Sequence, residues 1–436
     1  MPTPAHTKLL DNLQQKTFMY FINEVNLTNG LVRDRTDTGG PSSIAGTGLA
    51  LASYPVGVER GYIEREDAIR RTLACLRFFA NSTQSTDKDA TGYKGFYYHF
   101  LDMQTGRRAW KSELSSVDSA FLLAGMLTSA EYFARDTPEE SEIRLLAKEL
   151  NERADWQWML NDGPTVSHGW KPERGFIRYR WQGYSEALLL YILGLGSPTH
   201  PLPPETYTAW TSTYKWKKIY GTEFLYSGPL FTHQLSHIWI DFRGIRDPYM
   251  QSKQSDYFEN SGRATHVQRE YGKRNPMGFT GYGEDCWGFT ASDGPGWITC
   301  EVDGIERRFY DYISRGAPFG PDDGTIAPWA VVASLPFAPD IVLPAIEQFN
   351  QLKLMDPNPY GFKTAFNRTF PAKNAETAGW ISAGHCGINQ GPIVLMIENY
   401  RTELIWKLMR NCPAIVTGLR RAKFTGGWLQ HTPAGG

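Results

Sequence analysis

The sequence has almost no net charge and no long apolar run. Its 45 Lys and Arg residues are balanced by 46 Asp and Glu residues, which gives a net charge of −1. Proteins that bind nucleic acid or an anionic membrane usually carry a basic excess, so neither partner is expected. No apolar run approaches the roughly 20 residues of a membrane-spanning helix. Because the start, MPTPAHTKLL, has no apolar signal-peptide core, we expect a cytoplasmic protein, or a periplasmic one if a signal peptide was removed.

Paired cysteines and nucleotide-binding motifs are also missing. The 5 cysteines are scattered singly with no CxxC pair, which favours reduced thiols over a disulfide framework. No GxGxxG, Walker or GxSxG motif stands in a suitable context. His233 and His237 are spaced like two metal ligands on a helix, but no HExxH pattern or third ligand accompanies them. The sequence therefore indicates no cofactor and no metal.

Aromatic residues, in contrast, are abundant. They make up 14% of the chain, with 14 Trp and 22 Tyr, and planar rings beside a wet cleft are a common way of holding sugars. The hydrophobic content of 41% suffices for a full core. Since no linker or low-complexity tract divides the chain, we predict a single domain over residues 1–436.

Two kinds of helical segment alternate along the chain. The amphipathic segments have one apolar face and are residues 6–25, 63–80, 137–160, 203–215, 255–274 and 339–353. The other segments, called uncharged below, are nearly free of charge, with Asp118 as the exception, and are residues 43–58, 116–130, 187–195, 228–240, 324–336 and 386–397. A helix that is apolar on every face must be surrounded by protein, and the many small residues permit close helix–helix approach. Six buried segments interleaved with six amphipathic ones predict an all-α fold, an (α/α)6 barrel of helical hairpins.

Long connections rich in Gly, Trp, Tyr and Phe precede two of the uncharged segments. Residues 91–112 read TGYKGFYYHFLDMQTGRRAWKS, and residues 166–181 read VSHGWKPERGFIRYRW. Both are typical of short β-hairpins, and loops of this length in a compact domain are usually functional. We expect them at the rim of the active site.

Ionisable or polar residues recur at the entrances of the uncharged segments. In WQGYSEALLLYILGLG, residues 181–196, Glu186 stands directly before a run of nine residues without charge. The inner helices of a hairpin ring all point the same way, so residues at their N-terminal ends would share one cleft. Glu186, Glu113 and Asp118 are therefore candidate catalytic residues.

Each of these carboxylates also has a structural interpretation. Asp118 follows Ser115 at the spacing of a capping box. Glu186 could simply complement a helix dipole. Glu113 could be an exposed surface residue.

Two other acidic motifs favour structural roles. Residues 322–324, Asp-Asp-Gly, fit a turn followed by a helix cap. Asp241 follows an uncharged segment at its far end, and an ion pair with Arg243 or Arg246 is the favoured interpretation.

Several carboxylates without a metal or nucleotide motif fit glycoside hydrolysis. One carboxyl must donate a proton to the leaving oxygen while another activates water or attacks the anomeric carbon. Desolvation at the base of an aromatic cleft would raise the pKa of Glu186, whereas a helix N-terminus would lower it.

Seven segments, in this order, carry a family resemblance: YPVGVERGYI (54–63), SELSSVDSAFLLAG (112–125), YSEALLLYILGLGSPTHP (184–201), HQLSHIWIDFRGIRD (233–247), TASDGPG (290–296), DDGTIAP (322–328) and GPIVLMIENYRTELIWKLM (391–409). Through them the chain resembles the glucoamylase-like family of bacterial proteins that includes glycoside hydrolase family 144, the β-1,2-glucanases. The resemblance implies an (α/α)6 barrel and hydrolysis of β-1,2-linked glucan or its oligosaccharides, with inversion and without a metal. The family also covers domains of cyclic β-1,2-glucan synthases.

The resemblance also suggests roles for individual residues. Glu113, Asp118 and Glu186 match the acidic positions that line the family's cleft. Three aromatic residues in matching segments are candidates for glucosyl stacking: Trp181, Tyr184 and Trp287. The other candidate substrate-binding residues are Arg180, His99, Asp323 and Asn389.

One position departs from the family pattern and keeps other functions open. Where many relatives read GIDQGP, this chain reads GINQGP, so Asn389 replaces an Asp. A glucan-binding or regulatory protein without turnover is therefore one alternative. An (α/α)-barrel lyase or epimerase is another, because Arg178, Arg180 and His99 could neutralise a sugar carboxylate.

Overall fold

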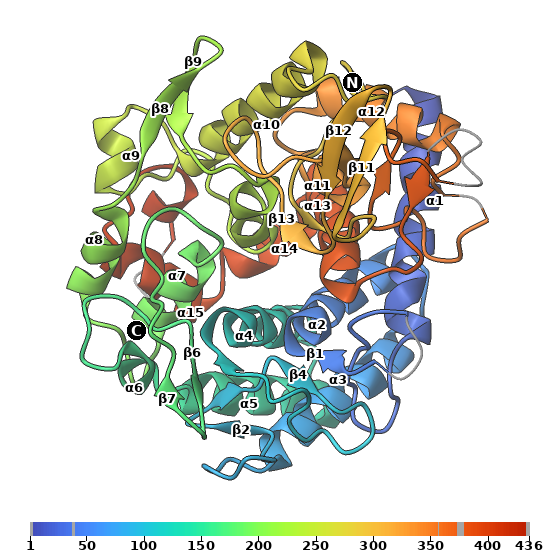
Figure 1. Ribbon diagram of the computed structural model, residues 1–436. Coiled ribbons are helices and arrows are strands. Elements are labelled where there is room, and N and C mark those ends of the chain that lie inside the picture. Colours follow the sequence, from blue (N-terminus) through green and yellow to red (C-terminus); the bar gives the residue numbers. More distant parts are fainter. Residues whose placement is uncertain (1–2, 37–39, 356, 373–378, 433–436) are drawn as a thin grey trace. The chain divides into compact units, whose positions relative to one another are not determined.

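The computed structural model describes residues 3–36, 40–355, 357–372 and 379–432, and this part of the chain is rich in helix (Figure 1). The residues pack into two compact units. The first contains the described residues of Met1–Tyr20, Trp216–Leu235 and Phe258–Arg401, and the second those of Phe21–Lys215, Ser236–Tyr257 and Thr402–Gly436. The single domain expected from the sequence stays a prediction. No helix in the described ranges is long and apolar enough to cross a membrane.

The second unit is mostly helical, and several of its helices pack against one another in pairs, among them α3 with α5 and α7 with α15. Thr137 caps α5 by accepting a hydrogen bond from the Glu140 N–H, with Pro138 at the first helical position. The helices of this unit are α2 (Ile44–Glu59), α3 (Arg65–Asn81), α4 (Ser116–Tyr132), α5 (Pro138–Arg153), α6 (Trp156–Leu160), α7 (Leu188–Gly196), α8 (Pro204–Thr211), α9 (Pro248–Ser252), α14 (Leu404–Met409), α15 (Pro413–Arg421) and the 3₁₀ helix η3 (Gly427–Gln430).

Helices α2 and α4 lie side by side with their backbones in contact (Figure 1). A Cβ atom on Gly125 would overlap with the carbonyl oxygen of Gly48, and one on Gly48 would overlap with the carbonyl oxygen of Phe121. Only glycine fits at both positions. The predicted close approach of the uncharged segments is therefore confirmed for this pair.

The first unit contains most of α1 (Pro4–Asn23), nearly all of α10 (Tyr257–Arg274) and α13 (Gly387–Thr402), and the whole of α11 (Pro328–Ala333) and α12 (Pro339–Gln351). The amphipathic and uncharged segments predicted over residues 6–25, 255–274, 339–353 and 386–397 correspond to four of these helices. Polar side chains bind the unit together in its interior. For example, Gln14 on α1 donates to Glu398 on α13 at 3.0 Å.

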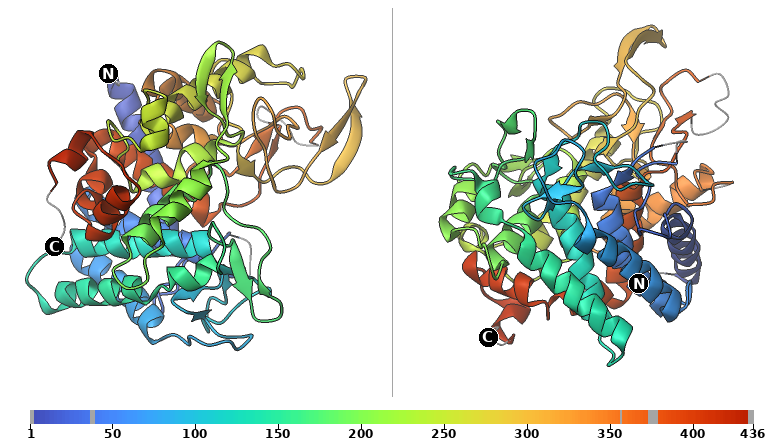
Figure 2. Two further views of the ribbon diagram at one scale, coloured as in Figure 1. Left: turned by 90° about the vertical axis from the view of Figure 1, so that its left-hand side faces the viewer. Right: turned by 90° about the horizontal axis from the view of Figure 1, so that it is seen from below.

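Short antiparallel strands form the connections between the helices. In the second unit they are β1 (Ser42–Ser43), which pairs with β4 (Phe100–Leu101), β2 (Gly92–Tyr93) with β3 (Phe96–Tyr97), and β5 (Leu114–Ser115) with β6 (Gly169–Lys171) and β7 (Gly175–Phe176). In the first unit they are β8 (Trp216–Ile219) with β9 (Thr222–Leu225), β10 (Ala291–Ser292) with β13 (Ile313–Ser314), β11 (Ile298–Val302) with β12 (Ile305–Phe309), and β14 (Thr325–Ile326) with β15 (Phe366–Asn367) and β16 (Trp380–Ile381). The predicted hairpins in residues 91–112 and 166–181 are present, and β11 and β12 form a further hairpin that extends away from the helices of its unit (Figure 2).

Two of the predicted uncharged helices are wrong in form. Residues 228–240 form two short 3₁₀ helices, η1 (Leu230–His233) and η2 (Leu235–Ile238), and no continuous α-helix. Gln234 lies between them, and its side chain donates to the Ser334 hydroxyl at 2.7 Å, so it is anchored outside any local helix. In residues 324–336 the helix covers only Pro328–Ala333, because strand β14 comes first and a Pro starts a helix readily.

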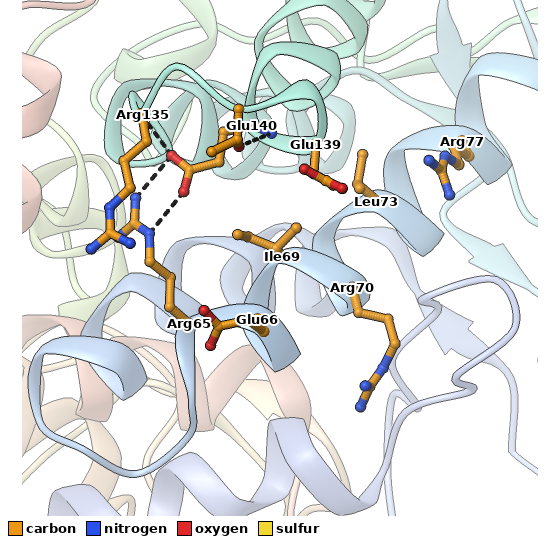
Figure 3. Close-up of a pocket in the computed structure, with 10 residues that line it drawn as sticks. Arg65, Glu66, Ile69, Arg70, Leu73, Arg77, Arg135, Glu139 and Glu140 are labelled. Carbon is orange, nitrogen blue, oxygen red and sulfur yellow. Dashed lines mark hydrogen bonds and ion pairs between the residues drawn. The ribbon is translucent and has the colours of Figure 1, made fainter.

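An ion pair joins the start of α3 to the start of α5 at the edge of a groove of about 470 Å³ in the second unit (Figure 3). The Arg65 guanidinium donates to both oxygens of Glu140, at 2.8 and 3.0 Å. Glu140 also accepts a hydrogen bond from the Arg135 N–H at 2.7 Å, and its side chain is only 1% exposed. The charges at this end of the groove are thus paired internally, so the groove has a structural explanation.

We expect Arg65→Ala to lower the free energy of unfolding by about 3 kcal/mol, because it leaves the Glu140 carboxylate buried without its cation. Arg77→Ala is the matched control on the same helix. Arg77 also donates to both oxygens of a carboxylate, Glu142, but that pair is 55% and 36% exposed, and its loss should change stability by only about 0.5 kcal/mol. Urea denaturation measures both variants, and equal losses would contradict the structural role of Arg65.

Candidate active site

Four ionisable residues lie close together in the second unit, near the starts of α4 and α7. His99 lies between β3 and β4, and Glu113 stands directly before β5. The backbone N–H of His99 donates to the carbonyl oxygen of Glu113 at 2.9 Å, so these two residues are neighbours across the strand connection. Asp118 lies in the first turn of α4, and Glu186 lies two residues before α7.

The side chain of His99 interacts directly with those of Glu113 and Asp118. His99 Nδ1 lies 3.1 Å from Glu113 Oε1, and His99 Nε2 lies 3.7 Å from Asp118 Oδ2. The imidazole stacks on the Phe100 ring, with centroids 4.0 Å apart and planes at 12°. The negative charge of Asp118 in turn acts on Glu186. The structure thus brings together the three carboxyl groups that the sequence singled out.

The structural interpretations of these residues can now be weighed. Ser115 does cap α4, since its hydroxyl accepts from the Asp118 N–H at 3.2 Å. The same hydroxyl donates to the Asp118 carboxylate, which remains directed toward His99. Glu186 precedes the N-cap residue Ala187, so it stands outside the first turn of α7, where a dipole partner is expected.

The three carboxyl groups are in different electrostatic environments. Burial raises the pKa of Glu186 to about 7, and the charge of Asp118 adds to this effect. The hydrogen bond from His99 lowers the pKa of Glu113 to about 2. For His99 itself, burial opposes protonation, but Asp118 and Glu113 outweigh it and raise its pKa to about 9. At neutral pH Glu186 is therefore the group able to carry and release a proton beside an ionised carboxylate.

Two predicted stacking residues are half-buried and held by ring contacts. Trp181 stacks on His168 with centroids 3.9 Å apart, and its indole N–H donates to the Ser116 hydroxyl at 2.9 Å. Tyr184 stacks on Tyr257 with centroids 5.9 Å apart. Both rings are oriented by their neighbours while keeping an accessible part, as a sugar-binding platform requires.

The predicted role of Arg180 in substrate binding is not supported. Its guanidinium donates to the carbonyl oxygens of Leu160 and Asn161, at 2.8 and 3.0 Å, and to that of Thr165. These bonds satisfy carbonyl groups at and beyond the C-terminus of α6. Arg180 is committed to the backbone around that helix end.

Two candidates in the first unit are buried in its core, which corrects their predicted roles. Trp287 is 0% exposed, so neither face of its ring can meet a sugar. Asp323 is also 0% exposed and forms a two-bond ion pair with Arg315, at 2.7 and 2.8 Å. It accepts further bonds from the backbone N–H groups of Tyr310 and Thr325. Asp323 thus has a structural role, as the sequence favoured, but the predicted helix cap is wrong, because the N-cap residue of α11 is Ala327 and Asp323 instead pairs with Arg315.

Of the two remaining polar residues, Asn389 and Asp241, the structure explains only Asp241. Asn389 lies in the first turn of α13 and is 5% exposed, so its role in substrate binding stays a prediction. Asp241 forms the predicted ion pair with Arg243, at 2.8 Å, and Arg410 is a second partner.

Some residues of the cluster were not predicted from the sequence. His168 supports Trp181 by stacking, and Ser115 and Ser116 bind Asp118 and Trp181. His168 lies in the aromatic segment of residues 166–181 that the sequence did single out, so its place at the end of a hairpin strand was the available signal. Ser115 was singled out only as a possible helix cap, and Ser116, the first residue of α4, carries no signal in the sequence.

Comparison with known proteins decides the family. The model of the Glycoamylase family, described as "Putative glucoamylase", matches residues 178–413, more than half of the chain. The chain belongs to this family. The resemblance stated from the sequence is therefore confirmed, and the match includes Glu186 but begins after Glu113 and Asp118.

Solved structures of glucoamylase-like proteins share the helix-rich fold. A structure from Bacteroides uniformis with the same description as the family is 32% identical, has a TM-score of 0.85, and covers 98% of this chain and 99% of that one. An endo-β-1,2-glucanase from Chitinophaga pinensis, solved with sophorotriose and glucose, is 27% identical, has a TM-score of 0.82, and covers 97% and 99% of the two chains.

The chain is also similar to a longer protein, of which it spans little more than half. The exo β-1,2-glucooligosaccharide sophorohydrolase (non-reducing end) of Parabacteroides distasonis is 28% identical over 450 residues. The match covers 95% of this chain but only 57% of that protein.

Proposed function

We propose that this protein is a glycoside hydrolase that cleaves β-1,2-glucan or its oligosaccharides by acid/base catalysis, with Glu186 as the general acid. The relatives from Chitinophaga pinensis and Parabacteroides distasonis, whose names specify β-1,2-linked substrates, support the linkage. We also propose that the helices form an (α/α)6 barrel, and that the location is cytoplasmic.

The environment of Glu186 is the observation that carries the proposal. A general acid at neutral pH needs a pKa near the working pH, and burial gives Glu186 a pKa of about 7. The second carboxylate of a glycosidase must be ionised, and Asp118 and Glu113 are the neighbouring candidates. Half-buried Trp181 and Tyr184 would hold glucosyl rings beside them.

Hydrolysis of the glycosidic bond requires two proton transfers, one from Glu186 and one to a second carboxylate. Glu186 gives its proton to the glycosidic oxygen as the bond from that oxygen to the anomeric carbon breaks. A water oxygen forms the new bond to the anomeric carbon, and the water proton passes to Asp118 or Glu113. We propose inversion, for which the two working carboxyl groups of a glycosidase stand roughly 6.5–9.5 Å apart.

Incubation with linear glucans of defined linkage tests the proposal. We expect release of β-1,2-linked oligosaccharides from β-1,2-glucan, with the α-anomer formed first in a proton NMR time course. Absence of products from β-1,2-glucan at every pH between 4 and 9 would rule the proposal out. Ultraviolet-absorbing unsaturated products would instead assign a lyase.

The dependence of kcat/KM on pH gives a second prediction. Glu186 acts only while it holds its proton, and the protonated fraction falls as the pH rises through its pKa of about 7. We therefore expect kcat/KM to fall about tenfold for each pH unit above this value. A kcat/KM that stays constant up to pH 9 would show that Glu186 is not the acid.

Asn389 favours one alternative, a glucan-binding protein without turnover. An Asp at this position in relatives would add a carboxylate that this chain lacks. Calorimetric binding of β-1,2-glucooligosaccharides with no product over days would support this alternative against hydrolysis.

A further inference from the structure

We infer that His99 is a positioning residue whose imidazolium bridges the carboxyl groups of Glu113 and Asp118, so that Glu186 alone supplies the catalytic proton. The catalytic part of this inference rests on the proposed function. The charge of His99 does not, because it is a property of the folded protein without substrate.

The backbone and the ring of His99 are both fixed. Its N–H donates to the Glu113 carbonyl oxygen at 2.9 Å, and its own carbonyl accepts from the Ile44 N–H at 3.2 Å. The ring stacks on Phe100 at 4.0 Å. The imidazole therefore keeps one orientation, in which Nδ1 faces Glu113 and Nε2 faces Asp118.

Each ring nitrogen faces a carboxylate. Nδ1 lies 3.1 Å from Glu113 Oε1, and Nε2 lies 3.7 Å from Asp118 Oδ2. A neutral imidazole has one N–H and would present a lone pair to one of these anions, whereas an imidazolium presents an N–H to both. Two carboxylates on opposite sides of the ring thus favour the charged form.

The surrounding charges agree with this assignment. Acidic groups outnumber basic ones around the ring, and they come from the segment before β1, the segment before β5, α4 and the segment before α7. The groups that act on His99 or on its two partners are Glu113, Asp118, Asp34, Lys171, His168 and Glu186.

This charge divides the roles among the three carboxyl groups. Glu113 accepts a charge-assisted hydrogen bond and has a pKa of about 2, so it is a poor proton acceptor and serves as an anchor. Asp118 lies farther from the imidazole and is left to receive the water proton. Glu186, which has no cation beside it among the groups that shift its pKa, keeps its proton near neutral pH.

Proton NMR titration of the histidine C2–H signals tests the charge directly. His99→Asn identifies the signal by its loss, and His266→Asn, at an exposed position on α10, is the assignment control. We expect the His99 signal to titrate above pH 8, and Glu113→Gln to lower its midpoint by about one unit or more. A midpoint below pH 7, or one that Glu113→Gln leaves unchanged, would overturn the inference.

The pH profile of hydrolysis tests the consequence for catalysis. His99→Asn keeps a donor near the position of Nδ1 but removes the charge, so the acidic limb of kcat/KM should move up by about one pH unit or more. A merely structural residue would lower kcat/KM without moving this limb, and an unmoved limb would overturn the role in catalysis. His266→Asn should leave the profile unchanged. If the wild-type protein cleaves no glucan, the proposed function fails while the NMR titration still decides the charge of His99.

Discussion

Glu186→Gln is expected to lower kcat on β-1,2-glucan by about 10²–10⁴-fold, the usual contribution of a positioned general acid. The amide has nearly the same shape as the carboxylic acid but cannot give a proton to the leaving oxygen. Binding of β-1,2-glucooligosaccharides, measured by calorimetry, should persist, because the proposed stacking residues Trp181 and Tyr184 are unchanged.

A matched control separates this effect from a general effect of removing a buried carboxyl. Glu131 lies near the other end of α4, it is half-buried, and burial raises its pKa as well. Glu131→Gln should leave kcat within about twofold of wild type, because Glu131 and Asp118 lie near opposite ends of α4 and Glu131 is far from the proposed chemistry. Retention of more than one-tenth of wild-type kcat by Glu186→Gln would remove Glu186 from its proposed role.

Arg315→Met should lower the free energy of unfolding by about 3–5 kcal/mol, because the Asp323 carboxylate would be left buried without a cation. Arg315 and Asp323 are both 0% exposed. Arg315 also donates to the backbone carbonyl oxygens of Ser292, Tyr310 and Asp311, at 2.8, 3.2 and 3.2 Å. The substitution therefore removes several hydrogen bonds from the loops between β10 and β14 along with the ion pair.

Arg308→Met is the control for this variant. Arg308 is exposed on β12 and contacts only the Tyr310 ring, at 5.3 Å, among the interactions found in the described part of the chain. Its replacement should change stability by about 0.5 kcal/mol or less. Guanidinium denaturation measures the stability of both variants. Equal midpoints would show that the ion pair between Arg315 and Asp323 contributes little to the free energy of unfolding.

The helices were predictable where the deciding information is local. The cap formed by Thr137, the glycines that allow α2 to touch α4, and the uncharged composition of both helices are all visible in the sequence. The interruption of the helix predicted over residues 228–240 was not visible, because it depends on residues far away in the sequence. The side chain of Gln234 bonds to Ser334, which lies 100 residues away, and nothing near Gln234 in the sequence indicates that contact.

The candidate site divides in the same way. Glu113, Asp118 and Glu186 were found because each stands before or in the first turn of an uncharged segment. Arg180 and Trp287 were assigned by residue type and family position. The structure shows Trp287 fully buried and the Arg180 guanidinium bonded to backbone carbonyl groups, and neither environment was visible in the sequence. His99 was predicted from the sequence as a substrate-binding residue. Its position between Glu113 and Asp118 was not predictable, because it depends on the backbone hydrogen bond between His99 and Glu113, which lie 14 residues apart.

The contact between Gly48 and Gly125 leaves no room for a side chain where α2 and α4 cross. Gly125 lies two turns along α4 from Asp118, about 10 Å at the rise of an α-helix. Even one methyl group at that crossing would push α4, the helix that bears Asp118, away from α2. The distance between the Asp118 carboxylate and the His99 imidazole thus depends on a helix crossing that lies outside the candidate active site.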